Sequence, residues 1–249
     1  MNETIETILK HKSIRKFQDK PLAEEQIRTI VECAKAASTS SFIQAYSIIG
    51  VKDQEKKQRL AEIAGSQNYV AANGHFFVFC ADLYRHALIG EREGGDVKES
   101  IESTEKFMVA VIDAALAAQN AAIAAESMGL GICYIGGLRN NLEEVQNLLS
   151  TPERVIPLFG MAVGYPDQNP GMKPRLPFSH IYHEDRYEQD QENYLRQIGE
   201  YDHEIAAYYE ERTGGKRHDT WSRQITGMLE KKSRMYMKAF VEKNKLNKR

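Results

Sequence analysis

Cysteine is scarce in this chain, and neither sign of charge is in excess. The three cysteines among 249 residues, Cys33, Cys80 and Cys133, are an odd number, widely spaced and each in an apolar setting. They indicate buried free thiols in a reducing cytosol rather than disulfides or a metal site. The formal net charge of −2 and the 42% hydrophobic content are typical of a globular protein, and they favour neither nucleic-acid binding nor disorder.

Clear targeting and membrane signals are also missing. Residues 1–12 are amphipathic and carry two glutamates, so we expect no signal peptide. The most apolar stretch, residues 107–125, contains Asp113 and two carboxamide side chains, which favours a buried helix over a membrane span. We therefore predict a cytoplasmic protein without a membrane or nucleic-acid partner.

Familiar catalytic motifs are absent as well. The sequence contains no G-x-S-x-G, no H-E-x-x-H and no Walker loop. His180 and His183 stand close together but lack cysteine or carboxylate partners at ligand spacing, so we expect no metal site. The basic residues 243–249 are typical of a solvated terminus. Cations, glycines and hydroxyls without an evident nucleophile indicate that a cofactor carries the chemistry.

Apolar periodicity and turn residues predict an α+β fold. The expected helices cover residues 2–11, a segment beginning at Pro21, a segment from Asp53 to about Gly65, and residues 101–128, 142–149, 190–211 and 221–244. The expected strands cover residues 46–51, 76–83, 132–135 and 155–163. We predict one domain over residues 1–249, with a core over about 1–165. An extended C-terminal excursion and arm, about 166–249, would pack on this core or on a second copy of the chain.

The predicted helix 101–128 has an alanine-rich face. Small side chains let a neighbouring helix approach closely, so this face is a candidate for a tight subunit interface. Alanine is also the best helix former, so helix propensity alone can explain this face without a second subunit.

Two basic clusters far apart in the chain are candidates for binding one phosphate group together. The first is His11-Lys12-Ser13-Ile14-Arg15, and the second is Lys173-Pro174-Arg175. Arginine offers a rigid donor fork that suits phosphate oxygens, and lysine supplies a compact charge. The proline favours an extended Lys173, so that the side chains of Lys173 and Arg175 project the same way. Taken alone, each cluster also fits a solvated basic patch.

The glycines of residues 129–137 do not form a dinucleotide fingerprint, because their order is helix, glycines, strand. Gly129 and Gly131 are typical of a helix end and a turn. Gly136 and Gly137 follow the predicted strand 132–135, where glycine allows the backbone to approach a flat ligand closely. A plain turn before the helix at residue 142 explains this pair equally well.

Six segments, taken in order, resemble one known family. They are HKSIRKF (11–17), AASTSSFIQAYSIIGV (36–51), GLGICYIGGLRNN (129–141), PLFGMAVGYP (157–166), KPRLP (173–177) and ERTGGKRHDTW (211–221). Together they resemble the FMN-dependent nitroreductase family over essentially the whole chain. The similarity is closest to its NADPH-preferring branch of flavin reductases and oxygen-insensitive nitroreductases.

The resemblance implies an intertwined homodimer with an extended C-terminal arm. Each subunit would have a central mixed, mainly antiparallel sheet flanked by helices, and one FMN would bind at each subunit interface. The FMN-binding residues that the resemblance implies are His11, Lys12, Ser13, Arg15, Thr39, Ser40, Gln67, Tyr134, Ile135, Gly136, Gly137, Lys173 and Arg175. Position 12 is commonly arginine in the family, and Lys12 keeps the charge but loses the bidentate fork.

The resemblance also implies that Arg212 and Arg217 bind the 2′-phosphate of NADPH. Paired guanidinium groups suit a dianionic phosphate that NADH lacks. Ser41, Phe42 and Glu105 are candidate substrate contacts. The implied activity is hydride transfer from NADPH through bound FMN to flavins, nitroaromatics or quinones by a ping-pong mechanism. Two alternatives stay open, namely a flavin reductase that supplies reduced FMN to a partner oxygenase, and a flavin-binding sensor without catalysis.

Overall fold

The computed structural model describes residues 2–249, which form two compact units. The first unit extends to Pro170 and also holds Arg234–Arg249, whereas the second is Gly171–Ser233. The first unit contains four strands and most of the helices. Its strands are β1 (Tyr46–Val51), β2 (His75–Asp82), β3 (Gly131–Ile135) and β4 (Val155–Gly164). Its helices are α1 (Glu3–Leu9), α2 (Glu24–Lys35), α3 (Gln54–Ile63), α4 (Asn68–Ala71), α5 (Tyr84–Glu93), α6 (Lys98–Ile101), α7 (Thr104–Ser127), α8 (Leu142–Leu149) and α11 (Met237–Lys243).

The four strands make one sheet in the order β1-β2-β4-β3, and every neighbouring pair is antiparallel. One parallel bridge joins Ser13 to Ile132 at the β3 edge. Successive side chains of a strand point to opposite faces of the sheet. On β2, Phe77 and Phe79 therefore pack with α2 and α7, whereas Phe76 and Val78 pack with α3 and α4 on the other face. All of β2 is buried, which explains its continuous apolar sequence.

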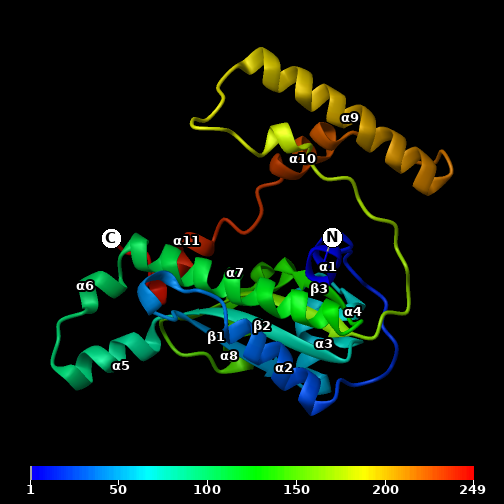
Figure 1. Ribbon diagram of the computed structural model, residues 1–249. Helices are drawn as coiled ribbons and strands as arrows, with labels where there is room; N and C mark the ends of the chain where they lie inside the picture. The colour runs from blue at the N-terminus through cyan, green and yellow to red at the C-terminus, as the bar shows by residue number, and fades with distance from the viewer. Residues whose placement is uncertain (1) are drawn as a thin grey trace. The chain divides into compact units, whose positions relative to one another are not determined.

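Helix α7 runs along one face of the sheet (Figure 1). The alanines of its alanine-rich face are buried inside the first unit, against α2 and the sheet, so this face is an internal contact. Several large apolar side chains of α7 are exposed, among them Met108, Ile112 and Leu116. The helix is long and apolar enough to cross a membrane, but half of its most apolar stretch is buried, as in the core helix of a globular protein.

The helix predicted over residues 101–128 is confirmed as α7, which begins after Ser103: its Oγ accepts the Lys106 N–H at 3.2 Å. One predicted helix is wrong in extent. The segment 221–244 divides, with Arg234 in the left-handed region at φ +57° between the two helices. The remaining predicted helices and the four strands are confirmed within a few residues, whereas α4, α5 and α6 were not predicted.

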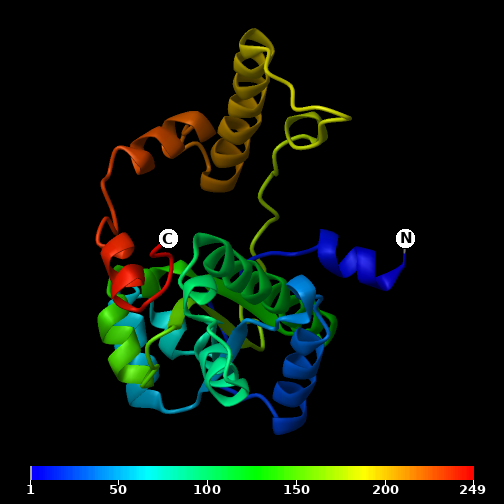
Figure 2. The same cartoon turned by 90° about the vertical axis from the view of Figure 1, so that its left-hand side faces the viewer.

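The second unit contains α9 (Gln191–Thr213) and α10 (Trp221–Leu229), which follow one another along the chain (Figure 2), and a short 3₁₀ turn at Phe178–His180. Among the described residues between β4 and α9, this turn is the one helical element, in agreement with the extended excursion that the sequence predicts after residue 166. Downstream of α10, Phe240, Val241 and Leu246 are buried in a cluster of the first unit. Of the three free cysteines, Cys80 and Cys133 are buried as predicted, and Cys33 is partly exposed.

Candidate functional site

The first basic cluster lies against the edge strand β3. The Ile14 N–H donates to the Ile132 carbonyl at 2.8 Å, and the Ile14 side chain is buried. Gly131 makes this approach possible, because a Cβ there would lie 2.5 Å from Ile14 Cγ1. At the start of the cluster, His11 Nδ1 is 2.7 Å from the Glu126 carboxylate at the end of α7. These contacts hold residues 11–15 beside the strand that leads to Gly136.

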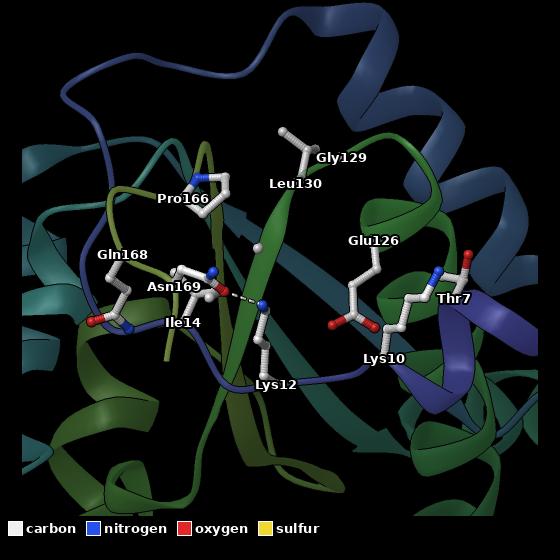
Figure 3. A pocket seen from close by; sticks show the side chains of 11 residues that line it. Thr7, Lys10, Lys12, Ile14, Glu126, Gly129, Leu130, Pro166, Gln168 and Asn169 are labelled. Atoms are coloured by element: carbon white, nitrogen blue, oxygen red, sulfur yellow. Dashed lines mark hydrogen bonds between the residues drawn. The ribbon is translucent and has the colours of Figure 1, made fainter. Parts of the chain in front are cut away.

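The side chains of this segment project in two directions. Lys12 and Ile14 line a cavity of about 410 Å³ between α1, the end of α7 and residues 166–169. In that cavity, Lys12 Nζ donates to the Asn169 Oδ1 atom (Figure 3). Glu126 faces the same cavity from the α7 side (Figure 3). Lys12 is therefore grouped with a carboxamide and a carboxylate.

Ser13 and Arg15 are grouped with other residues, Cys133 and Tyr69. Burial raises the pKa of the Cys133 thiol, while the Arg15 charge and a hydrogen bond with Ser13 act in the opposite direction. Burial likewise raises the pKa of Tyr69, which a hydrogen bond and the charge of Arg15 oppose. The structure thus gathers Ser13 and Arg15 with the end of β3 and the start of α4.

Gln67 belongs to the same group. It accepts a hydrogen bond from the Tyr69 hydroxyl, and its Nε2 donates to the Ala64 carbonyl at 2.6 Å. Ala64 also contacts the β3 end, because a Cβ on Gly137 would lie 2.6 Å from its carbonyl oxygen. Gly137 is therefore required for this close backbone approach. Three chain segments, at residues 13–15, 64–69 and 133–137, meet here.

Tyr134 is the one residue of β3 whose side chain is not buried, with 37% of its surface exposed. Its hydroxyl donates to the Ala118 carbonyl at 2.8 Å, and its ring meets Phe159 edge-on with centroids 5.7 Å apart. Burial of the hydroxyl end strongly raises the pKa of Tyr134. The neighbouring Ile135 is buried, so at this position only the backbone can contact a ligand.

The loop that holds Thr39 to Phe42 is fixed by a buried carboxylate. Asp113 on α7 is fully buried and accepts the N–H groups of Ser40 at 3.1 Å and Ala45 at 3.0 Å. Ser41 and Phe42 have positive φ angles of 49° and 59°, and the Phe42 side chain is 82% exposed. Among residues 2–249, no hydrogen bond joins this loop to residues 11–15. Glu105, in the first turn of α7, is exposed.

The remaining predicted cations belong to the second unit. Lys173 and Arg175 are exposed, as are Arg212 and Arg217. Arg217 donates from Nε to Asp219 Oδ2 at 2.6 Å, and its guanidinium lies 4.0 Å from the centre of the Tyr209 ring. The second unit therefore carries both predicted phosphate-binding pairs.

Sequence reasoning missed the residues that orient these groups. Tyr69, Asp113, Glu126 and Asn169 contact predicted site residues, but Asp113, Glu126 and Asn169 are at least 68 positions away from their partners. Only Tyr69 is close in sequence to the predicted site residue that it contacts, since it lies two positions from Gln67. Among residues 2–249, no three histidine, cysteine, aspartate or glutamate side chains are grouped to hold a metal ion.

The chain belongs to the nitroreductase family. Two family models match it, "Nitroreductase family" over residues 8–165 and "Nitroreductase family, C-terminal domain" over residues 173–249. The family predicted from the six sequence segments, with its α+β fold, is thereby confirmed.

Particular relatives are similar over their full length. The chain is 56% identical over 248 residues, which is 100% of both chains, to the FMN reductase (NADPH) of Bacillus subtilis. The structure of NfrA1 from B. megaterium matches with a TM-score of 0.98 and 64% identity, covering 99% of this chain and 100% of that one. The NADPH:FMN oxidoreductase of Vibrio harveyi, complexed with NAD⁺, matches with a TM-score of 0.90 and 44% identity over 100% of both chains.

The residues gathered in the first unit fit a phosphorylated flavin. Arg15 is exposed and offers a donor fork to an anion, with the Ser13 hydroxyl beside it. The Gln67 amide matches the donor and acceptor pattern of a heterocycle edge. The backbone at Gly137 borders the same region through its close approach to Ala64, whereas the half-exposed Tyr134 side chain lies against Ala118 and Phe159. This set of donors suits FMN better than a metal ion or a nucleophile-dependent reaction.

Proposed function

We propose that the protein is an FMN-dependent NADPH oxidoreductase that reduces flavins, nitroaromatics or quinones by a ping-pong mechanism. The observation that carries this proposal is the meeting of residues 13–15, 64–69 and 133–137, which brings an exposed arginine, a hydroxyl and a carboxamide together. The names of the relatives from B. subtilis and V. harveyi agree with NADPH as donor and FMN as flavin.

The side chains would bind and orient rather than react. Ser13 and Arg15, together with Lys173 and Arg175 of the second unit, would neutralise the FMN phosphate. Glu126 orients His11 through their 2.7 Å contact, and Asp113 holds the backbone of Ser40. When bound, FMN supplies the two-electron chemistry for which the chain has no side chain.

The remaining predicted contacts are part of the same proposal. Gln67, Thr39 and Ser40 would bind the ribityl and pyrimidine atoms, and residues 134–137 would border the ring with backbone N–H groups. Lys12 would add positive charge near the phosphate, while its own hydrogen bond goes to Asn169. Ser41, Phe42 and Glu105 would contact the acceptor. The strongly exposed Phe42 is suited to stack on a flat molecule.

We further propose that the active form is a homodimer. The first unit exposes apolar side chains on α1 and α7, including Ile8 at 45% and Ile112 at 50%. Several exposed large apolar side chains on two helices are what an interaction site would offer. A second subunit would cover these helices and bring in the loop 39–42, which has no hydrogen bond to residues 11–15 of its own chain. The proposed location is the cytoplasm, which agrees with three free cysteines.

A flavin reductase that supplies reduced FMN to a partner oxygenase remains the second candidate, because the B. subtilis relative is named an FMN reductase. The two activities differ in their preferred acceptor. We expect kcat/KM to be higher for a nitroaromatic or quinone than for free FMN if the protein is a general reductase. A preference for free FMN supports the second candidate. In either case, double-reciprocal plots should give parallel lines, and intersecting lines would exclude the ping-pong order.

The NADPH specificity is tested by the double variant Arg212→Ala with Arg217→Ala. Removing both guanidinium groups should raise KM for NADPH about tenfold or more, since charge-assisted hydrogen bonds to phosphate are strong. KM for NADH, which lacks the 2′-phosphate, should change little. Lys231→Ala, an exposed cation of the same unit outside this loop, is the matched control. Equal losses with NADPH and NADH would contradict the phosphate role.

A further inference from the structure

The core of the second unit is built largely from tyrosine. Tyr201, Ile205 and Tyr209 are spaced four residues apart on α9, so they lie on one face of the helix. All three are buried, with exposed fractions of 4%, 0% and 7%. Leu176 and Trp221 pack against this face. Tyrosine at these positions buries an apolar ring and also places a hydroxyl and a π-surface next to the flanking cations.

Tyr201 holds the second basic cluster. Its hydroxyl donates to the carbonyl oxygen of Pro174 at 3.0 Å, and Pro174 lies between Lys173 and Arg175. Burial raises the pKa of Tyr201, and the positive charge of Arg175 acts against this rise. One partly buried hydrogen bond therefore fixes the backbone between the two cations that are proposed to bind the FMN phosphate.

Tyr209, two turns further along α9, contacts cations of both predicted phosphate sites. The Arg217 guanidinium carbon lies 4.0 Å from the ring centroid, and Lys173 Nζ lies 5.7 Å from it. Both distances are within the range of cation–π attraction. Gln224 Oε1 accepts from the Tyr209 hydroxyl at 3.2 Å and from Arg217 Nη2 at 3.2 Å, which ties the guanidinium to this ring.

We propose that Tyr209 is a positioning residue shared by the NADPH 2′-phosphate site and the FMN phosphate site, whereas Tyr201 positions the FMN phosphate site alone. This inference rests on the proposed function. An exposed arginine or lysine loses side-chain entropy when a ligand immobilises it, and a ring that already restricts the cation reduces that cost. One aromatic ring that restricts Lys173 and Arg217 thereby links the affinities of the two ligands.

The test uses probes that report binding without turnover. 2′,5′-ADP carries the 2′-phosphate without the nicotinamide, and its affinity for the FMN-loaded protein is measured by calorimetry. AMP, which lacks the 2′-phosphate, is the reference ligand. FMN affinity is measured from flavin release on dilution. The variants are Tyr209→Leu, Tyr209→Phe and Tyr201→Phe, and the last removes only the hydrogen bond to Pro174.

We expect Tyr209→Leu to weaken both 2′,5′-ADP and FMN binding by roughly three- to tenfold, with AMP binding unchanged. Tyr209→Phe keeps the ring and should stay within about twofold of the parent protein for both ligands. Tyr201→Phe should weaken FMN by roughly two- to tenfold and leave 2′,5′-ADP unaffected. If Tyr209→Leu lowers the unfolding temperature strongly, Tyr209→Met, which fills more of the buried space without a π-surface, takes its place and is combined with Arg217→Gln in a double-mutant cycle. The two changes should then be non-additive for 2′,5′-ADP.

Three results would overturn the inference while leaving the proposed function intact. They are unchanged binding in Tyr209→Leu, a loss in Tyr209→Phe as large as in Tyr209→Leu, and full additivity in the cycle. A parent protein that binds neither FMN nor 2′,5′-ADP would instead overturn the proposed function, and this inference with it.

Discussion

His75 has the most unusual environment among the histidines of the structure's described residues. It begins β2, is 3% exposed, and its Nε2 has no hydrogen-bond partner among residues 2–249. A Cβ on Gly50 would lie 2.8 Å from this nitrogen, so the neighbouring strand leaves no room for another group. Burial lowers the pKa of His75 to about 4, with further lowering by Lys52 and Lys57 and a small opposing effect of Glu24.

This histidine should make stability depend on pH. In the unfolded chain His75 has the ordinary histidine pKa of about 6.5, so between pH 6.5 and about 4 the unfolded state binds more protons than the folded one. Folding is therefore opposed progressively as pH falls through this window, by up to about 3 kcal/mol. His75→Gln should reduce the difference in free energy of unfolding between pH 7 and pH 4.5, measured with urea. His218→Gln, at an exposed position, should leave the difference as it is. An unchanged pH dependence in His75→Gln would contradict the assignment.

Within the candidate site, residue types were predictable from the sequence and their grouping was not. Arg15 and Lys12 were both predicted as phosphate contacts because they are cations in one short cluster. The extended backbone sends Lys12 to Asn169 and Arg15 to Tyr69, on different sides. This alternation follows from pairing with β3, a contact between residues 13 and 132 that no local pattern indicates.

At the scale of elements, the pairing of β2 with β4 depends on one glycine. Gly160 lies opposite Val78, and a Cβ there would lie 2.2 Å from the ring of Phe76. Gly160→Ala should destabilise the protein by about 1–3 kcal/mol, because a buried aromatic ring and its strand must shift. Urea unfolding followed by circular dichroism measures this loss.

Gly199 provides the matched control for that substitution. It lies inside α9, and a Cβ there would meet nothing within 4 Å. Gly199→Ala should therefore be neutral or stabilise by up to about 1 kcal/mol, since glycine is a poor helix former. Equal effects of the two substitutions would show that the contact with Phe76 does not determine the result.

Strands and most helices were predictable because their signals are local. The continuous apolar run of β2 and the Asp53 cap of α3 are both confirmed, with Asp53 Oδ1 accepting the Lys56 N–H at 2.8 Å. The helix predicted over residues 101–128 is confirmed as α7, whose start is set by the Ser103 cap. The error over residues 221–244 arose where no local signal exists. The break near Arg234 accompanies the return of α11 to the first unit, which is a tertiary effect.

At the scale of the whole molecule, the first unit leaves a row of apolar side chains uncovered. Met108, Ile112 and Leu116 are spaced four residues apart on α7 and are 53%, 50% and 45% exposed. Helical spacing places them on one face. The proposed homodimer would bury this face, and the FMN sites at its interface would depend on it.

Ile112→Lys should therefore shift the protein from dimer to monomer and release FMN, because a charge cannot be buried in an apolar interface without a partner. Light scattering after size exclusion gives the mass, and flavin absorbance of the same peak gives the occupancy. Gln58→Lys introduces the same charge on the exposed side of α3 and should change neither. A parent protein that is monomeric at micromolar concentration would contradict the dimer.

The most direct test of the account is the visible spectrum of the purified protein under nitrogen. Because the chain gathers the donors that we propose to bind FMN and carries the arginine pair that we propose to bind NADPH, we predict a yellow protein with one FMN per chain. Addition of NADPH should bleach the flavin absorption, and a nitroaromatic or quinone should restore it. A colourless protein that takes up no added FMN, or a bound flavin that NADPH does not bleach, would contradict the proposed function.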